Sequence, residues 1–226
     1  RQLDPARERL QLGAELIGAD TVAAVSEVVV LALEALGAAG LTGISVDFTL
    51  PDLVDTLAVQ GGDFDAEKVE AIRRELDTKD AGGLKAAGGE AYLPLLYATG
   101  PIAEALPKLR DFDADGVLST RLDGLEAVAA RVGESARITL DPTERHGFEY
   151  QSWFGFTLYA EGLRGAAGRG GTYRIGGTDE AATGFTLFVD RLAEAVPETE
   201  APRTVYLPLG HDPAVAARLR EEGCIH

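Results

Sequence analysis

Residues 11–50 hold the clearest structural pattern of the chain and read QLGAELIGAD TVAAVSEVVV LALEALGAAG LTGISVDFTL. Residues 7–17 alternate apolar and polar side chains around a glycine that would weaken a helix, so we predict a strand there. Residues 21–39 place valines and leucines three and four apart, which predicts a helix that Asp20 can cap. Residues 43–50 alternate again and predict a second strand. The core therefore begins with a strand, a helix and a strand.

The rest of the chain predicts a helical middle followed by a run of strands. We expect helices at 51–59, 65–77, 91–98, 101–109 and 119–132, with a loose glycine-rich connector at 78–90. Strands are expected at 136–140, 152–161, 167–175, 183–189 and 204–207, and a last helix at 213–222. This grouping is typical of an α+β protein. We divide the chain into a core, residues 1–195, and residues 196–226, which form a short appendage or the start of a removed domain.

Composition and charge argue against several classes of function. The 226 residues include 21 Lys and Arg against 37 Asp and Glu, a net charge of −16. We therefore expect no nucleic-acid partner and no docking on anionic membranes. The only cysteine, Cys224, cannot form an internal disulfide, and the three histidines complete no recognisable zinc set with it.

The chain also lacks an apolar run of about 20 residues and a signal peptide. We expect a cytoplasmic protein without metal or cofactor. Because the chain starts at Arg1, has no methionine and stops after Gly-Cys-Ile-His, we expect it to be part of a longer protein.

The strand at 7–17 carries the first candidate site. Gln11 and Glu15 share one face of that strand, and Gly13 between them leaves open space above the sheet. A carboxylate and an amide beside a hollow can hold an ammonium or imidazole group. The alternative is an ordinary polar face exposed to water.

Three later segments offer further candidates, each with a structural alternative. Residues 145–150, Arg-His-Gly-Phe-Glu-Tyr, offer a histidine as acid or base, or in a simple polar contact. Residues 168–174, Gly-Arg-Gly-Gly-Thr-Tyr-Arg, resemble an anion-binding nest and also fit a hairpin turn. Residues 183–192 predict a strand that enters a helix capped by Asp190, where Arg191 contacts a ligand or pairs with a carboxylate.

In this order, these segments resemble the catalytic core of the histidyl-tRNA synthetases and their paralogues, the regulatory subunits of ATP phosphoribosyltransferase. Residues 11–18 match the strand that closes the second class II motif, and Arg7 matches a basic position before it. Residues 145–150, 170–173 and 184–192 lie at the first histidine-specific motif, the Gly-Gly-Arg-Tyr-Asp motif and the third class II motif. The resemblance covers about residues 1–195. It implies a class II aminoacyl-tRNA synthetase-like α+β core with an antiparallel sheet flanked by helices.

The departures from the synthetase pattern fall mainly on the ATP side. His146 stands where the synthetases carry a catalytic arginine, and a neutral imidazole stabilises negative charge poorly. Gln151 replaces the second motif tyrosine. Phe188 replaces a motif-three glycine, where its ring would crowd a nucleotide, although Arg191 matches the motif-three arginine.

The resemblance therefore implies a histidine sensor that performs no chemistry. We expect a regulatory subunit of ATP phosphoribosyltransferase that activates the short-form catalytic subunit, binds L-histidine as feedback effector and self-associates in the full-length protein. The candidate histidine-binding residues are Arg7, Gln11, Glu15, His146, Tyr150 and Tyr173, while Phe188 and Arg191 mark the degenerate nucleotide side. The alternatives are a histidyl-tRNA synthetase core or other histidine-activating ligase, and a scaffold with an empty pocket.

Overall fold

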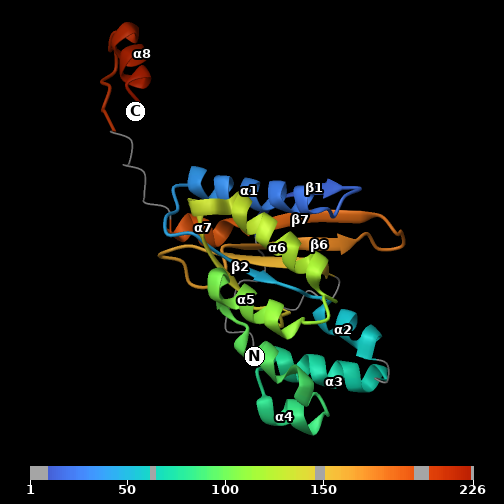
Figure 1. The fold of residues 1–226 in the computed structure, drawn as a ribbon. Helices are drawn as coiled ribbons and strands as arrows, with labels where there is room; N and C mark the ends of the chain where they lie inside the picture. The colour runs from blue at the N-terminus through green and yellow to red at the C-terminus, as the bar shows by residue number, and fades with distance from the viewer. Residues whose placement is uncertain (1–9, 62–64, 146–150, 196–203, 225–226) are drawn as a thin grey trace. The chain divides into compact units, whose positions relative to one another are not determined.

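Residues 10–61, 65–145, 151–195 and 204–224 are described by the structure, which is a computed structural model (Figure 1). The chain divides into two compact units, one within residues 1–195 and the other within 196–226. The first unit holds a seven-stranded sheet in the order β1-β7-β6-β5-β2-β4-β3. The strands are β1 Gln11–Ile17, β2 Ser45–Thr49, β3 Gly100–Pro101, β4 Arg137–Leu140, β5 Gln151–Tyr159, β6 Gly168–Arg174 and β7 Ala181–Phe188.

The α+β class is confirmed, but the sheet is mixed, not wholly antiparallel. β2 and β4 run parallel, whereas the other neighbouring strands are antiparallel. A parallel pair needs a long crossover, and the helices between residues 50 and 136 supply it. Strand alternation alone carries no information about the direction of the partner strand, so the sequence could not reveal this pair.

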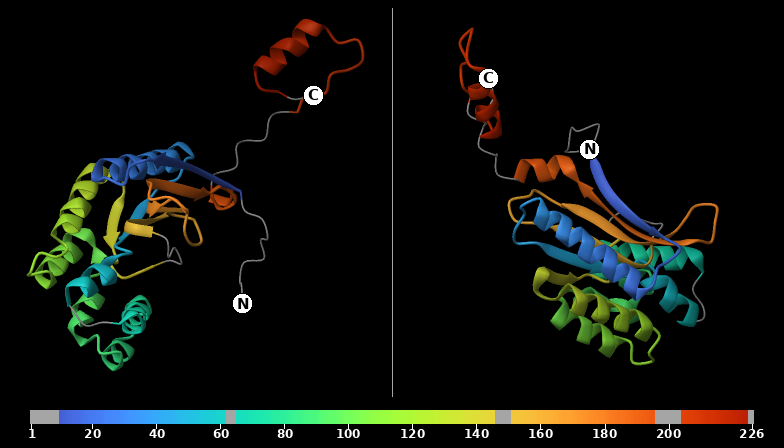
Figure 2. Two further views of the ribbon diagram at one scale, coloured as in Figure 1. Left: turned by 90° about the vertical axis from the view of Figure 1, so that its right-hand side faces the viewer. Right: turned by 90° about the horizontal axis from the view of Figure 1, so that it is seen from above.

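Two helices cover one face of the sheet. Helix α1, Val22–Ala38, and helix α6, Ser119–Val132, lie against each other on that face (Figures 1 and 2). The helix predicted at 21–39 is confirmed, but its N-cap is Thr21, not Asp20, because the Thr21 hydroxyl accepts the Ala24 N–H at 3.3 Å. Fully buried apolar side chains join the helices to the sheet, among them Val25, Val29, Leu36, Phe48, Leu125, Phe154 and Leu158.

The crossover between β2 and β4 is more helical than the sequence predicts. Besides α6, it contains α2 Leu53–Gly61, α3 Ala66–Asp77, α4 Ala81–Ala86, the 3₁₀ helix η1 Glu90–Tyr97, α5 Ile102–Phe112 and the 3₁₀ helix η2 Gly133–Ser135. The expected loose connector at 78–90 is wrong, because α4 occupies part of it. The Asp80 carboxylate caps α4 by accepting the N–H groups of Gly82 and Gly83, both at 2.9 Å, and Leu84 is fully buried. Capping and burial thus outweigh the low helix propensity of the glycines.

Helix α7, Val189–Ala195, follows β7 directly. Asp190 lies in its first turn and not at the N-cap, and its carboxylate accepts the Leu10 N–H at 2.8 Å. The expected cap is therefore wrong, and the same carboxylate instead ties the start of β1 to this helix.

The second unit is described only between residues 204 and 224. The predicted strand at 204–207 is wrong, because Thr204 forms a single bridge and no strand follows it. The predicted last helix is confirmed as α8, Pro213–Glu221, which Asp212 caps. No helix within the described parts of either unit is long and apolar enough to cross a membrane.

Candidate functional site

The candidate site lies where β1, β7 and β6 run side by side. β1 packs Ala14 and Leu16 against the core and turns Gln11, Gly13 and Glu15 to the other face. Side chains directly opposite each other on paired strands share a face, so the strand register defines rows across this face. The rows are Gln11–Phe188, Gly13–Thr186–Arg169, Glu15–Gly184–Gly171 and Ile17–Ala182–Tyr173.

A cavity of about 220 Å³ opens over these rows. Pockets for drug-sized ligands span about 300–1,000 Å³, so this volume suits a smaller molecule such as an amino acid. The described residues that line it are Gln11, Glu15, Gln151, Arg169, Gly170, Gly171, Tyr173, Gly184, Phe185, Thr186 and Phe188.

The floor of the cavity is made of glycine backbone. A Cβ atom on Gly184 would lie 2.8 Å from Glu15 Cγ and 2.9 Å from the Ala14 carbonyl oxygen. A Cβ atom on Gly171 would lie 2.6 Å from the Phe154 carbonyl oxygen. Both contacts are shorter than real Cβ atoms make, so only glycine keeps this floor open. The strand predicted at 167–175 is confirmed as β6, so this segment is neither an anion-binding nest nor a hairpin turn.

Four of the site residues predicted from the sequence line the cavity. Gln11 and Glu15 lie on the β1 side, Tyr173 on β6, and Phe188 at the end of β7. The rows place Phe188 and Tyr173 toward opposite ends of the cavity, so their rings limit its length. Whether these residues bind histidine stays a prediction.

Arg191 takes another position. It is absent from the cavity lining given above, and its guanidinium carbon lies 5.5 Å from the centre of the Phe188 ring. Its Nη1 donates a hydrogen bond to the Ala166 carbonyl oxygen at 3.1 Å. The predicted residues Arg7, His146 and Tyr150 lie outside the described residues.

Three polar lining residues, Gln151, Arg169 and Thr186, were missed as binding candidates. Gln151 was noted only as a departure from the motif, and its Nε2 donates to the Gly170 carbonyl oxygen at 2.9 Å. Arg169 stands two positions before Gly171 and four before Tyr173, so on a strand all three share one face. That alternation was the available signal, but residues 168–174 were considered only as a nest or a turn when binding residues were sought.

The polar face continues past Arg169 toward the centre of the sheet. In the strand register, Arg169 on β6 lies opposite Thr157 on β5, and Thr157 lies opposite Asp47 on β2. Asp47 in turn lies opposite Thr139 on β4. Thr157 is 1% exposed, and its hydroxyl has no hydrogen-bond partner among the described residues. The Thr139 hydroxyl donates to Asp47 Oδ1 at 2.7 Å. The same face therefore carries a row of buried and half-buried polar side chains beside the cavity.

Several acidic side chains lie close to Asp47, at the end of this row. Burial, followed by the negative charges of Asp141 and Asp47, raises the pKa of Glu144 from 4.5 to about 7. Burial also raises the pKa of Asp47, despite its hydrogen bond from Thr139. Lys79 Nζ contacts Asp141 Oδ1 at 2.6 Å. No group of acidic, histidine and cysteine side chains suited to a metal ion is found in the ranges that the structure describes.

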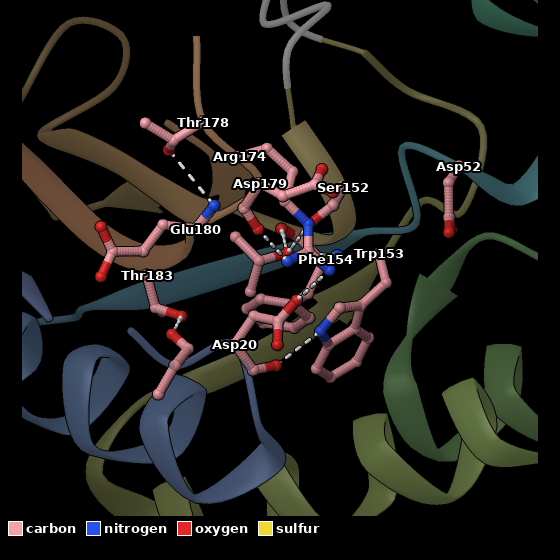
Figure 3. A network of polar contacts seen from close by, with 12 residues as sticks. Asp20, Asp52, Ser152, Trp153, Phe154, Arg174, Thr178, Asp179, Glu180 and Thr183 are labelled. Atoms are coloured by element: carbon pink, nitrogen blue, oxygen red, sulfur yellow. Dashed lines mark hydrogen bonds and ion pairs between the residues drawn. The ribbon is translucent and has the colours of Figure 1, made fainter. Parts of the chain in front are cut away.

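A hydrogen-bond network fixes the turn between β1 and α1 (Figure 3). Trp153 Nε1 donates to the Asp20 carbonyl oxygen at 2.8 Å, and the Thr183 hydroxyl donates to the Ala19 carbonyl oxygen at 2.8 Å. Arg174 Nη2 lies 3.6 Å from Asp20 Oδ2. Because β1 ends just before this turn, these bonds from β5, β6 and β7 hold the strand that carries Gln11 and Glu15.

Comparison with known proteins agrees with this geometry. The ATP phosphoribosyltransferase regulatory subunit of Rhodospirillum centenum is 40% identical over 98% of this chain and 59% of its own length. The same subunit of Paramagnetospirillum magneticum is 38% identical over 99% of this chain and 60% of its own length. The chain thus spans about three-fifths of these relatives.

A solved structure and a family profile support the same assignment. An ATP phosphoribosyltransferase regulatory subunit/histidyl-tRNA synthetase from Bacillus halodurans superposes with a TM-score of 0.71 and 25% identity, over 87% of this chain and 55% of its own. The profile of the histidyl-tRNA synthetase family matches residues 1–192. The seven-stranded core, the motif order and these matches agree that this chain belongs to the histidyl-tRNA synthetase family.

Proposed function

We propose that this chain is the core of a regulatory subunit of ATP phosphoribosyltransferase, which binds L-histidine and does not activate it. The observation that carries the proposal is the 40% identity to a relative of that name, which extends over 98% of the chain. The cavity supports it, because Glu15 and Gln11 offer oxygen acceptors to an ammonium or imidazole group. Since the chain spans three-fifths of that relative, its activity and partners are part of the proposal.

The proposed mechanism is a difference in histidine affinity between two states of an assembly. The partner is the short-form catalytic subunit, which the regulatory subunit activates in the cytoplasm, and the full-length protein self-associates. Histidine inhibits if it binds the inactive assembly more tightly than the active one. A coupling free energy of about 1–3 kcal/mol gives a 5- to 150-fold difference in affinity.

The alternative with a specific basis is a histidyl-tRNA synthetase core, because the Bacillus halodurans neighbour carries both names. Phe188 argues against it. Its ring lies at one end of the cavity, at the position where the synthetase motif has a glycine, and leaves less room for a nucleotide. The discriminating assay is histidine-dependent exchange of pyrophosphate into ATP.

The proposal is tested with the catalytic subunit. The chain is added to the short-form catalytic subunit, and phosphoribosyl transfer is measured with and without L-histidine. We expect activation, and inhibition by histidine that Glu15→Gln weakens. The matched control is Glu27→Gln, an exposed glutamate of α1, which leaves inhibition unchanged. Pyrophosphate exchange together with no effect on the catalytic subunit would establish the alternative.

A further inference from the structure

The cavity carries opposite charges on its two long sides. Glu15 lies on β1 and Arg169 on β6, with β7 between them. Neighbouring strands are about 4.8 Å apart, so the two backbones are separated by about 10 Å across the sheet. Between them, Gly184 contributes no side chain, and neither does Gly171 on the Arg169 side. The free space is therefore bordered by a carboxylate on one side and a guanidinium on the other.

Arg169 has a second donor beside it. Thr186 lies directly opposite Arg169 on β7, and both line the cavity. On the other side of Thr186 stands Gly13, whose Cβ position would lie 3.3 Å from the Thr186 hydroxyl oxygen, so this hydroxyl borders the row on the β1 side. A planar guanidinium binds a carboxylate through two parallel hydrogen bonds, and a neighbouring hydroxyl can add a third. This row thus offers donors to an anion, whereas the neighbouring row offers the acceptor of Glu15.

We infer that Arg169, assisted by Thr186, binds the α-carboxylate of the amino acid in the cavity. The ligand is then a free amino acid oriented by both ends, with its cationic groups toward Glu15 and its carboxylate toward β6. This inference rests on the proposed function and adds the residue that makes the cavity select a carboxylate. A compound with the same imidazole and ammonium but no carboxylate binds more weakly.

The test compares two ligands on two variants. L-Histidine and L-histidinol, which carries a hydroxymethyl group in place of the carboxylate, are titrated into the full chain by calorimetry. We expect wild type to prefer histidine by about 10- to 100-fold, the range for loss of a charge-assisted hydrogen bond. Arg169→Gln removes this preference by weakening histidine alone. Arg164→Gln removes an exposed arginine in the loop before β6 and leaves the preference unchanged.

The ligand pair separates recognition from a structural role. Arg169 also acts electrostatically on Tyr159, so its substitution could disturb the neighbouring row of polar side chains. A disturbed cavity would weaken both ligands equally, and that result would overturn the inference. Preserved preference in Arg169→Gln would overturn it as well.

Two further results complete the test. Arg169→Lys keeps the charge but loses the planar pair of donors, so we expect a partial preference for histidine. Thr186→Val keeps Arg169 and is expected to reduce the preference for histidine over histidinol by a smaller factor. This variant tests carboxylate binding by Arg169 and Thr186 even if Arg169→Gln does not fold. Wild type that binds neither ligand would contradict the proposed function together with the inference. Wild type that binds both equally would contradict the inference alone.

Discussion

Glu144 gives the sharpest prediction for stability. Its folded-state pKa of about 7 lies above the 4.5 of the free side chain, because burial and the charges of Asp141 and Asp47 disfavour the carboxylate. Between these two pH values the unfolded chain releases the proton and the folded chain keeps it. The folded state therefore loses stability as the pH rises from about 4.5 to about 7, and the loss is complete above pH 7.

The magnitude follows from the two pKa values. Each tenfold difference in proton affinity corresponds to about 1.4 kcal/mol, so the full difference is about 3 kcal/mol. Glu144 is partly exposed to solvent, which screens the charges and reduces the effect to about 1–2 kcal/mol. Glu144→Gln mimics the protonated side chain at every pH. We expect the variant to be more stable than wild type by this amount at pH 8, and by much less near pH 5.

Urea denaturation followed by circular dichroism at several pH values measures this difference. Glu134→Gln is the matched control, because it removes one carboxylate from an exposed position. If the free-energy difference between Glu144→Gln and wild type stayed the same from pH 5 to pH 8, Glu144 would not be the titrating group, and a variant that is less stable at pH 8 would exclude it as well.

Three further predictions follow from the packing. Gly184→Ala should fold but lose histidine binding in calorimetry, because its Cβ would lie 2.8 Å from Glu15 Cγ; unchanged affinity would contradict the glycine floor. Arg121→Ala breaks the half-buried pair with Asp52, in which Nε lies 3.0 Å from Oδ1, and should cost about 1–3 kcal/mol in urea denaturation. Leu36→Ala empties a fully buried position of α1 and should cost about 2–5 kcal/mol, measured by the same denaturation; a cost below 1 kcal/mol would mean that the site collapses around the smaller side chain.

The elements that were predicted correctly are those in which buried side chains recur along the sequence with the period of a helix or a strand. In β2, Val46 and Phe48 are fully buried and Asp47 between them is not. The alternation of apolar and polar side chains is therefore visible within residues 43–50. In α1, Val25 and Leu36 are fully buried on the helix face that the three-and-four spacing indicates. Such signals need no knowledge of which segment packs on the other side.

The parts that failed depend on distant partners or on single contacts. Helix α4 forms because Asp80 caps it and Leu84 finds a buried position, neither of which its glycines suggest. The parallel pairing of β2 with β4 depends on the path of the crossover. Gln11 and Glu15 were predicted as a pair because they share a strand. Arg169 shares a strand face with Tyr173, which alternation could have shown, but its place opposite Thr186 requires the register of β6 on β7.

The most direct test of the central claim is a calorimetric titration of the chain with L-histidine, in the presence and absence of ATP. We expect histidine to bind with the same affinity in both cases, because under the proposed function the cavity binds the amino acid and the Phe188 ring leaves little room for a nucleotide. Histidine binding that ATP strengthens would contradict the account and support a histidine-activating enzyme. Absence of histidine binding, both alone and with the catalytic subunit added, would refute the assignment of the cavity as a histidine site.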